Sequence, residues 1–227
     1  MVSSPLGPRL EAVARLVSCG AILADVGTDH GYLPIYLIEC GKIEKAVLSD
    51  INKGPLEKAR TNVKLHNLEE RVELCLTDGA ADLASKGITE YSVCGMGGEL
   101  IADILAAAPQ MKEQGIGLIL QPMSRAEALR SYLWDNGFSI LKEVHSCEDG
   151  KYYVCMRAEY IGEKTQYTTP EAHFGKADKA HGDSAAQGYL RTKLSALRKA
   201  KEGRLMGGVP TDEEDELIAY AESLLKL

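Results

Sequence analysis

The chain has 227 residues, a formal net charge of −7, and 45% hydrophobic and 26% charged residues, which is typical of an ordinary globular domain with an appendage. No apolar run reaches membrane-spanning length, and the charged N-terminal segment is unlike a signal peptide. Six cysteines without a Cys-x-x-Cys pair argue against a zinc site or disulfide framework, and the overall acidity disfavours a nucleic-acid partner. We expect a cytoplasmic protein with reduced thiols and no metal.

Alternating strand and helix patterns occupy the chain up to about residue 161. A short helix over Leu10–Val17 precedes five strand–helix units and two further strands around Asp149-Gly150, a hairpin turn signal. Helix starts are marked by Asn52 and by a Ser124-x-x-Glu127 capping box. Strands are expected over 21–26, 45–51, 71–78, 91–95, 117–121, 138–145 and 152–160. This order predicts a Rossmann-like α/β fold with a seven-stranded sheet.

Residues 162–227 have a different pattern, which predicts a C-terminal helical domain. Positions 162–183 are polar and turn-rich, and are expected to form a linker with one short helix. Leu190, Leu194 and Leu197 line one following helix. A second helix is opened by Thr211-x-x-Glu214 and is lined by Leu217, Ala221, Leu224 and Leu225. We therefore expect one domain over 1–161 and an antiparallel helical hairpin within 162–227.

The most informative stretch is Asp25-Val26-Gly27-Thr28-Asp29-His30-Gly31, between the first strand and a helix. In doubly wound sheets this turn binds a nucleotide-like ligand. A dinucleotide fingerprint needs glycine where Asp29 stands, because the backbone there approaches a pyrophosphate that a carboxylate repels. The spacing suits instead the ammonium and sulfonium of S-adenosyl-L-methionine (SAM), as a variant of the class I methyltransferase loop. An ordinary strand–turn–helix without a ligand is the alternative.

Further polar residues stand where the next strands end, at the edge of the sheet that binds ligands. The Asp50 carboxylate can accept hydrogen bonds from ribose hydroxyls, and Asp78-Gly79 suits an adenine ring; helix capping and an ordinary turn are the alternatives. After the fourth strand, glycines let the backbone approach a ligand, and Met96 can form an adaptable wall for a base. The predicted cofactor site comprises Asp25, Gly27, Asp29, Gly31, Asp50, Ile51, Asp78, Gly79, Cys94, Gly95, Met96 and Gly97.

The catalytic candidates are Asp29, His30 and Gln121. Gln121 closes the apolar run of the fifth strand, where it can contact the target or simply provide turn polarity. His30 lies in the ligand-binding turn, where packing or capping is an equally good interpretation. Cys94 is interpreted as a packed residue rather than a nucleophile, because no histidine is placed to activate it.

One helical stretch departs from the overall acidity of the chain. Residues 187–204 carry six basic side chains and one acid, Glu202, so the local charge is six minus one, or +5. Such a face can follow nucleic-acid phosphates. A merely solvated helix, or pairing with the acidic run 212–216, is the alternative. The RNA-binding candidates are Arg191, Lys193, Arg198, Lys199, Lys201 and Arg204.

Taken together, the motifs DVGTDHGYLP, SDIN, TDG, CGMGGELI and LILQPM, followed by the helical hairpin, resemble the bacterial tRNA (adenine(22)-N1)-methyltransferase family, TrmK. The resemblance extends from about Leu10 to the end of the chain. It implies a class I SAM-dependent enzyme of tRNA modification that methylates N1 of an adenine in the D-arm, position 22, and whose tail helps to hold the tRNA. The residues alone leave open a methyltransferase of small molecules or proteins, or a non-catalytic RNA-binding module on the same fold.

Overall fold

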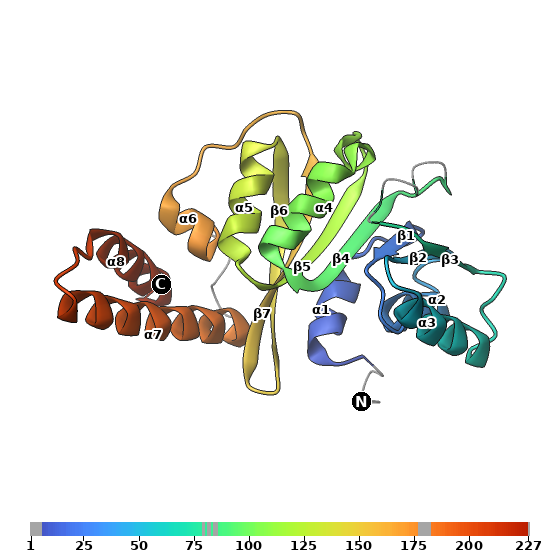
Figure 1. The fold of residues 1–227 in the computed structure, drawn as a ribbon, viewed down its shortest axis with the longest axis horizontal. Helices are drawn as coiled ribbons and strands as arrows, with labels where there is room; N and C mark the ends of the chain where they lie inside the picture. Colours follow the sequence, from blue (N-terminus) through green and yellow to red (C-terminus); the bar gives the residue numbers. More distant parts are fainter. Residues whose placement is uncertain (1–5, 79, 81–82, 84–85, 177–182, 227) are drawn as a thin grey trace.

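The computed structural model describes residues 6–78, 80, 83, 86–176 and 183–226, and in these residues the chain forms a seven-stranded sheet flanked by helices (Figure 1). The strand order is β3-β2-β1-β4-β5-β7-β6, and β7 runs antiparallel to both of its neighbours. The strands are β1 (Ile22–Val26), β2 (Lys45–Asp50), β3 (Val72–Leu76), β4 (Glu90–Gly97), β5 (Gly117–Ser124), β6 (Phe138–Glu148) and β7 (Lys151–Tyr160). The predicted fold class is confirmed.

Helices cover both faces of the sheet, because alternate residues of each strand point to opposite sides. In β1, Leu23 packs with α1, α2 and α3, whereas Ala24 and Val26 pack with α4 and α5. The helices are α1 (Pro8–Leu16), α2 (Tyr32–Glu39), α3 (Lys53–Leu65), α4 (Gly98–Ala107) and α5 (Ala126–Asp135), with a 3-10 turn at Pro109–Lys112. None of the helices in the described part of the chain is long and apolar enough to cross a membrane.

The direction of the strand order reverses between β1 and β4, which are parallel neighbours although β2 and β3 lie between them in sequence. The connections that follow β1 and β4 therefore leave the sheet on opposite faces, and a crevice opens between their carboxyl ends. The turn at 27–31 and the Cys94–Gly97 segment both lie at this point. The fold thus brings the two most glycine-rich predicted motifs together.

A long β-hairpin joins the sheet to the tail. Asp149 and Gly150, with φ angles of 49° and 73°, form the turn between β6 and β7, as the sequence predicts. The hairpin passes between α1 and α7, as Figure 1 shows. Both strands extend beyond their expected ends, because the pairing continues to Glu148 and Lys151 next to the turn.

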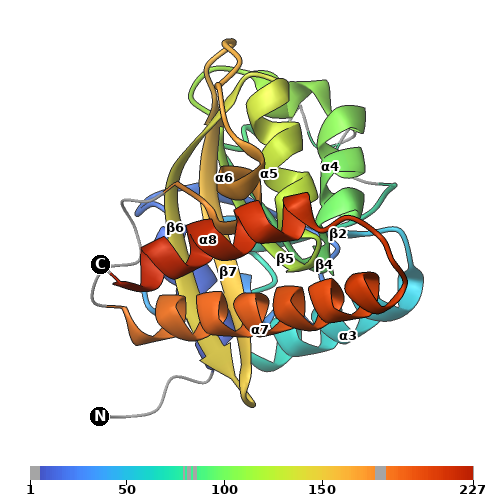
Figure 2. The ribbon, with the colours of Figure 1, turned by 90° about the vertical axis from the view of Figure 1, so that its left-hand side faces the viewer.

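The tail consists of α6 (Thr169–Phe174), α7 (Ser184–Met206) and α8 (Asp212–Lys226), and α7 and α8 lie side by side in Figure 2. Leu190 and Leu194 of α7 pack against Leu217 and Ala221 of α8 in a small core of their own, as predicted. The expected short helix in the linker is α6, which opens with a Thr168 capping box. The expected helical hairpin is therefore present.

Three expected side-chain caps do not form, although α3 and α8 begin directly after Asn52 and Thr211 as expected. Ser124 is the last residue of β5, and α5 begins after Arg125 without a side-chain cap, so no capping box forms there. Asn52 occupies the N-cap position of α3, but its side chain makes no capping bond. Its backbone N–H donates instead to the Asp50 carboxylate. Thr211 donates its hydroxyl to Asp215, while Glu214 accepts from Arg204 on α7. In the third case pairing between the two tail helices replaces the local cap.

A buried ion pair attaches the tail to the sheet. Arg130 of α5 is fully buried and donates to Glu143 of β6, with its Nε 2.7 Å from Oε1. Its Nη1 also donates to the carbonyl oxygens of Ala172 and His173, at the end of α6, at 3.0 and 3.1 Å. One guanidinium therefore holds three elements in place, two from the core and one from the tail.

Replacing Glu143 by Ala should lower the free energy of unfolding by about 3–5 kcal/mol, because it leaves the Arg130 charge buried and unpaired. Urea denaturation measures the loss. Lys142→Ala, an exposed change on the same strand, is the control and should stay within about 0.5 kcal/mol of the unchanged protein. Equal stabilities of the two variants would contradict this role of the ion pair.

Candidate functional site

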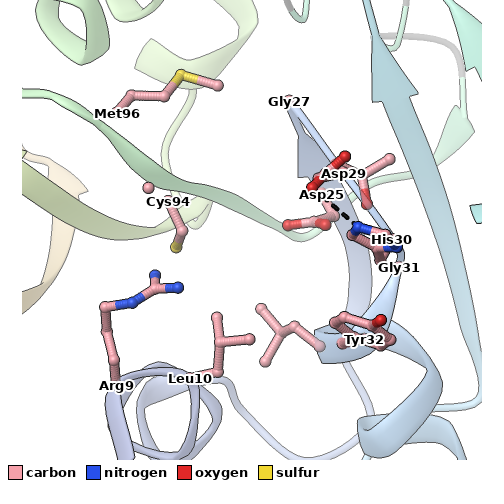
Figure 3. Close-up of a pocket in the computed structure, with 13 residues that line it drawn as sticks. Arg9, Leu10, Asp25, Gly27, Asp29, His30, Gly31, Tyr32, Cys94 and Met96 are labelled. Atoms are coloured by element: carbon pink, nitrogen blue, oxygen red, sulfur yellow. Dashed lines mark ion pairs between the residues drawn. The ribbon is translucent and has the colours of Figure 1, made fainter. Parts of the chain in front are cut away.

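A cavity of about 450 Å³ lies at the carboxyl ends of β1 and β4, between the turn at 27–31 and the start of α1 (Figure 3). Its size falls within the range of small-molecule sites. The lining residues come from three parts of the chain: Arg9, Leu10, Asp25, Gly27, Thr28, Asp29, His30, Gly31, Tyr32, Leu33, Cys94, Gly95 and Met96. Seven of the twelve predicted cofactor residues are among them, namely Asp25, Gly27, Asp29, Gly31, Cys94, Gly95 and Met96.

The turn after β1 depends on two glycines. Gly27 and Gly31 have φ angles of 75° and 70°, which other residues rarely adopt. A Cβ at Gly31 would lie 2.8 Å from Leu48 Cδ2, so a side chain there would also force the turn away from β2. The amides of Gly27 and Thr28 donate to the Ser49 carbonyl at 2.8 and 3.0 Å. These contacts fix the turn against the end of β2.

Asp25 is the buried acid of the cavity. Its Oδ1 accepts a hydrogen bond from the Ser92 hydroxyl on β4 at 2.6 Å. Burial raises the pKa of Asp25 above its ordinary value, and the hydrogen bond from Ser92 offsets part of that rise. A buried carboxylate that lines a cavity and keeps lone pairs available is well suited to a cationic ligand.

Asp29 and His30 lie together at the rim of the cavity. The His30 Nε2 is 3.1 Å from Asp29 Oδ2, and the Lys58 ammonium of α3 donates to Asp29 Oδ1 at 3.1 Å. The His30 ring stacks on Tyr32 with centroids 4.9 Å apart and planes 3° from parallel. Asp29 remains 62% exposed, so its carboxylate is accessible to a ligand from the solvent side.

Arg9 lines the same cavity, and the sequence analysis missed it. Its Nη1 donates to Gln121 Oε1 at 2.7 Å, and the Gly95 amide donates to the same oxygen at 3.2 Å. Gln121 is fully buried and its Nε2 donates to the Pro122 carbonyl. The predicted catalytic candidate Gln121 therefore does not line the cavity but orients a cation that does. In the sequence Arg9 is only a charge within the apolar pattern of the first helix, which does not indicate its distant partners.

The fourth strand, β4, continues to Gly97, two residues beyond its expected end at Gly95, and α4 follows directly at Gly98. The pairing of β4 with β5 shifts register between Cys94 and Met96, and Gly95 there has φ 79°. Burial raises the pKa of the Cys94 thiol well above its usual value, which agrees with a packed, unreactive residue. The Met96 methyl group lies over Gly27, where a Cβ would be 1.9 Å from it. Gly97 is the N-cap of α4 and lies outside the cavity lining.

The remaining cofactor candidates lie along the adjacent strand ends rather than in the cavity. Asp50 ends β2, and its carbonyl accepts from the Thr77 amide at 3.1 Å, which places the ends of β2 and β3 next to each other. Ile51 is 61% exposed beside it. Asp78 is exposed just beyond β3, and Gly79 lies outside the described residues. These positions continue the row of strand ends from the turn at 27–31, because β2 lies between β1 and β3 in the sheet.

Four of the six basic candidates on α7 are already paired with acids. Arg198 is 2.7 Å from Glu222 and Arg204 is 2.8 Å from Glu214; Lys201 pairs with Asp215, and Lys193 with Glu127 of α5. In the described part of the chain, Arg191 and Lys199 make no ion pair, and both line two adjoining grooves with Ser195. Two of these four acids, Glu214 and Asp215, belong to the acidic run 212–216, so pairing with that run, one of the expected alternatives, accounts for part of this face.

In the described residues no group of three or more His, Cys, Asp or Glu side chains has the arrangement of a metal site.

The comparison with protein families matches residues 6–156 to a methyltransferase domain. The chain is 34% identical over 68% of its length to the tRNA (adenine(22)-N(1))-methyltransferase of Bacillus subtilis, and the match spans 65% of that enzyme.

Solved structures match over almost the whole chain. A Streptococcus pneumoniae protein in complex with S-adenosyl-L-methionine has a TM-score of 0.82 and 32% identity, with coverage of 99% of this chain and 100% of that one. Mycoplasma capricolum TrmK in complex with S-adenosylhomocysteine has a TM-score of 0.79 and 26% identity, with 97% and 98% covered. The likeness therefore includes the helical tail as well as the sheet.

Replacing Asp25 by Asn should stabilise the ligand-free protein at pH 8 more than at pH 4, which is close to the ordinary pKa of an aspartate. Because the folded-state pKa of Asp25 is raised, its contribution to stability is present at low pH and is lost as the pH rises through that pKa. Asn keeps an acceptor for Ser92 but never ionises. Urea denaturation at both pH values measures the difference in the free energy of unfolding. Asp103→Asn, at an exposed position of α4, is the control. A pH-independent difference between Asp25→Asn and the unchanged protein would contradict the assignment.

Proposed function

Because this chain belongs to the methyltransferase family of the matched domain and of the TrmK structures, we propose that it transfers a methyl group from SAM to N1 of an adenine in the D-arm of tRNA, at position 22. The observation that carries the proposal is the cavity at the β1/β4 switch point, which combines a glycine turn with acids in place of a phosphate-binding surface. We propose a cytoplasmic enzyme of tRNA modification.

The donor set of the cavity fits SAM. The cofactor has an ammonium and a sulfonium, and Asp25 and Asp29 present carboxylates to the cavity. Both would repel the pyrophosphate of a dinucleotide, which needs glycine and free amides at this turn. We place the ribose on the Asp50 carboxylate and the adenine of the cofactor between Ile51 and Asp78. The position of Asp50 and Asp78 at the adjacent ends of β2 and β3 supports that placement.

Methyl transfer to N1 of adenine needs alignment more than proton transfer. SAM supplies a methyl group on a positively charged sulfur, and N1 already has a lone pair in the plane of the ring. A general base is therefore unnecessary, and the site contributes mainly by holding the two reactants in line. Because N1 lies on the base-pairing edge, the adenine must be unpaired to enter.

The roles proposed for the catalytic candidates follow from where they lie. Asp29 and His30 stand at the rim, where a target base can approach, and the Asp29 carboxylate favours the positive charge that the base acquires. Gln121 acts indirectly, because its hydrogen bonds fix Arg9 and Gly95. Met96 forms the adjustable wall between the turn and β4.

We propose that residues 162–227 form the tRNA-holding domain. The fully buried Arg130, which holds the end of α6 on the core, keeps this tail in a fixed position relative to the cavity. Arg191 and Lys199 are its phosphate-binding residues, since the other candidates on α7 are neutralised by acids. The net charge of −7 makes such a local cationic groove necessary for approach to RNA.

Incubation of the full chain with methyl-labelled SAM and bulk tRNA tests the function directly. Digestion of the tRNA to nucleosides should place the label in 1-methyladenosine. A tRNA carrying guanine at position 22 should accept none. Label in another nucleoside, in protein or in small molecules only would overturn the proposal.

Replacing Asp50 by Ala should weaken SAM binding by about 1.5–3 kcal/mol, because the ribose hydroxyls lose a charged acceptor. Titration calorimetry measures this loss. Glu57→Ala removes an exposed acid on the neighbouring α3 and should leave the affinity unchanged. Unaltered SAM affinity in a folded Asp50→Ala variant would remove Asp50 from the site.

A matched pair of double variants tests the tail. Replacing Arg191 and Lys199 by Gln should flatten the slope of log K against log[salt] for tRNA by roughly 1.4–1.8, since two phosphate contacts are lost. Replacing Lys201 and Arg204 by Gln removes the same charge from the same helix but from residues paired with acids. That control should change the slope less. Equal slopes for the two variants would contradict the assignment of Arg191 and Lys199 as phosphate-binding residues.

A further inference from the structure

The hairpin of β6 and β7 projects beyond the rest of the sheet and separates α1 from α7 (Figure 1). Among the described residues, β7 pairs with β5 only over 156–159, so 151–155 form a two-stranded ribbon with β6. Because successive strand residues point to opposite faces, Tyr152 and Tyr153 face different helices. The Arg9 guanidinium carbon of α1 lies 6.0 Å from the Tyr153 ring centroid, whereas Tyr152 lies against α7.

A groove of about 540 Å³ lies on the α7 side of this hairpin. Its lining includes Tyr152 of the hairpin and, from α7, Gly188, Arg191, Ser195, Ala196 and Lys199. These α7 positions form the face of the helix opposite to the leucines that pack against α8. A ligand in the groove would therefore lie between the hairpin and the tail, on the side of α7 that α8 leaves free.

The Tyr152 ring is held in position by Gly188. A Cβ at Gly188 would lie 2.1 Å from Tyr152 Cε1, so the ring rests directly on the backbone of α7. Glycine inside a helix is destabilising relative to alanine, and the room that the ring needs explains it here. Tyr152 is half-buried by this contact and still lines the groove. A ring fixed in this way can bind a flat ligand with little further loss of conformational freedom.

The groove also has the charge for an anionic ligand. Arg191 and Lys199 are exposed, and in the described part of the chain neither makes an ion pair. Sites for single-stranded nucleic acid combine such cations with an aromatic ring on which a base stacks. A duplex keeps its bases stacked inside and needs only the cations. The aromatic wall therefore favours an unpaired nucleotide over duplex RNA.

We propose that this groove holds an unpaired nucleotide of the tRNA, with its base stacked on Tyr152 and its adjoining phosphates at Arg191 and Lys199. The inference rests on the proposed function and deepens it, because it concerns how the substrate is held while the target adenine is in the cavity. An adenine that enters the cavity leaves its pairing and stacking, and the base that faced it loses its partner. A site that accepts only unpaired bases shifts the tRNA toward this opened form.

The place of the groove relative to the cavity fits this role. The groove lies on one face of the hairpin, and α1, whose Arg9 and Leu10 line the cavity, lies on the other. The end of the hairpin, from Asp149 to Lys151, is exposed between them. One opened arm of RNA can therefore occupy both sites, with the end of the hairpin between its two strands.

Replacing Tyr152 by Leu tests the stacking, because Leu keeps apolar volume against Gly188 but has no ring face. The affinity for a tRNA with adenine at position 22 should fall roughly 5- to 150-fold. The slope of log K against log[salt] should not change, since no charge is removed. Tyr152→Phe keeps the ring and should bind within about twofold of the unchanged protein. A short blunt RNA duplex, which offers no unpaired base, should bind the unchanged protein and Tyr152→Leu equally.

Ala196→Leu is the second variant, and it replaces Tyr152→Leu if urea denaturation shows that the latter does not fold. It narrows the groove from an exposed position of α7 and leaves Tyr152 in place. It should therefore weaken tRNA binding, again without a change of the salt slope. The affinity for SAM should be unaltered in all of these variants, because the cavity lies on the other side of the hairpin.

The outcomes separate this inference from the function it rests on. If the unchanged protein binds no tRNA, the proposed function fails and this inference with it. If it binds tRNA but Tyr152→Leu, or Ala196→Leu in its place, keeps the full affinity, only the inference is overturned. Equal losses for the tRNA and the duplex, or a flattened salt slope, would show that Tyr152 merely positions α7 and would overturn the inference as well.

Discussion

The hydrogen bond between Asp25 and Ser92 lies where the sheet reverses its strand order, and the site depends on it. Asp25 is the second-last residue of β1 and Ser92 belongs to β4, so the 2.6 Å contact ties together the strands on either side of the crevice. It also keeps a carboxylate buried beside a cavity, where water would otherwise be its partner. Natural sites commonly retain such a costly group because a ligand uses it.

The charges of the molecule are organised in two facing arrangements. In the cavity, the acids of the turn after β1 face the cation Arg9. In the tail, three acids of α8 pair with three of the basic residues of α7, while Arg191 and Lys199 line open grooves. Both arrangements confine positive charge to a few positions in an acidic protein, which is a means of selecting where an anionic ligand can bind.

Local patterns in the sequence were sufficient for the fold and for the turn at 27–31, because strand alternation, helix periodicity and glycine requirements act over short distances. Arg9 could not be found in this way, since its partners Gln121 and Glu148 are 112 and 139 residues away. The failed capping box at Ser124 has a similar cause. Pairing of β4 with β5 continues to Ser124 and extends the strand over residues expected to start a helix.

The central claim is that the cofactor lies with its amino-acid end in the cavity beside Asp25 and its adenosine across the ends of β2 and β3. The most direct test is a crystal structure of this protein with S-adenosylhomocysteine. The account predicts the amino-acid end of the ligand in the cavity beside Asp25 and the ribose hydroxyls within hydrogen-bonding distance of the Asp50 carboxylate. A ligand in the reverse orientation, or one seated away from the turn at 27–31, would contradict it.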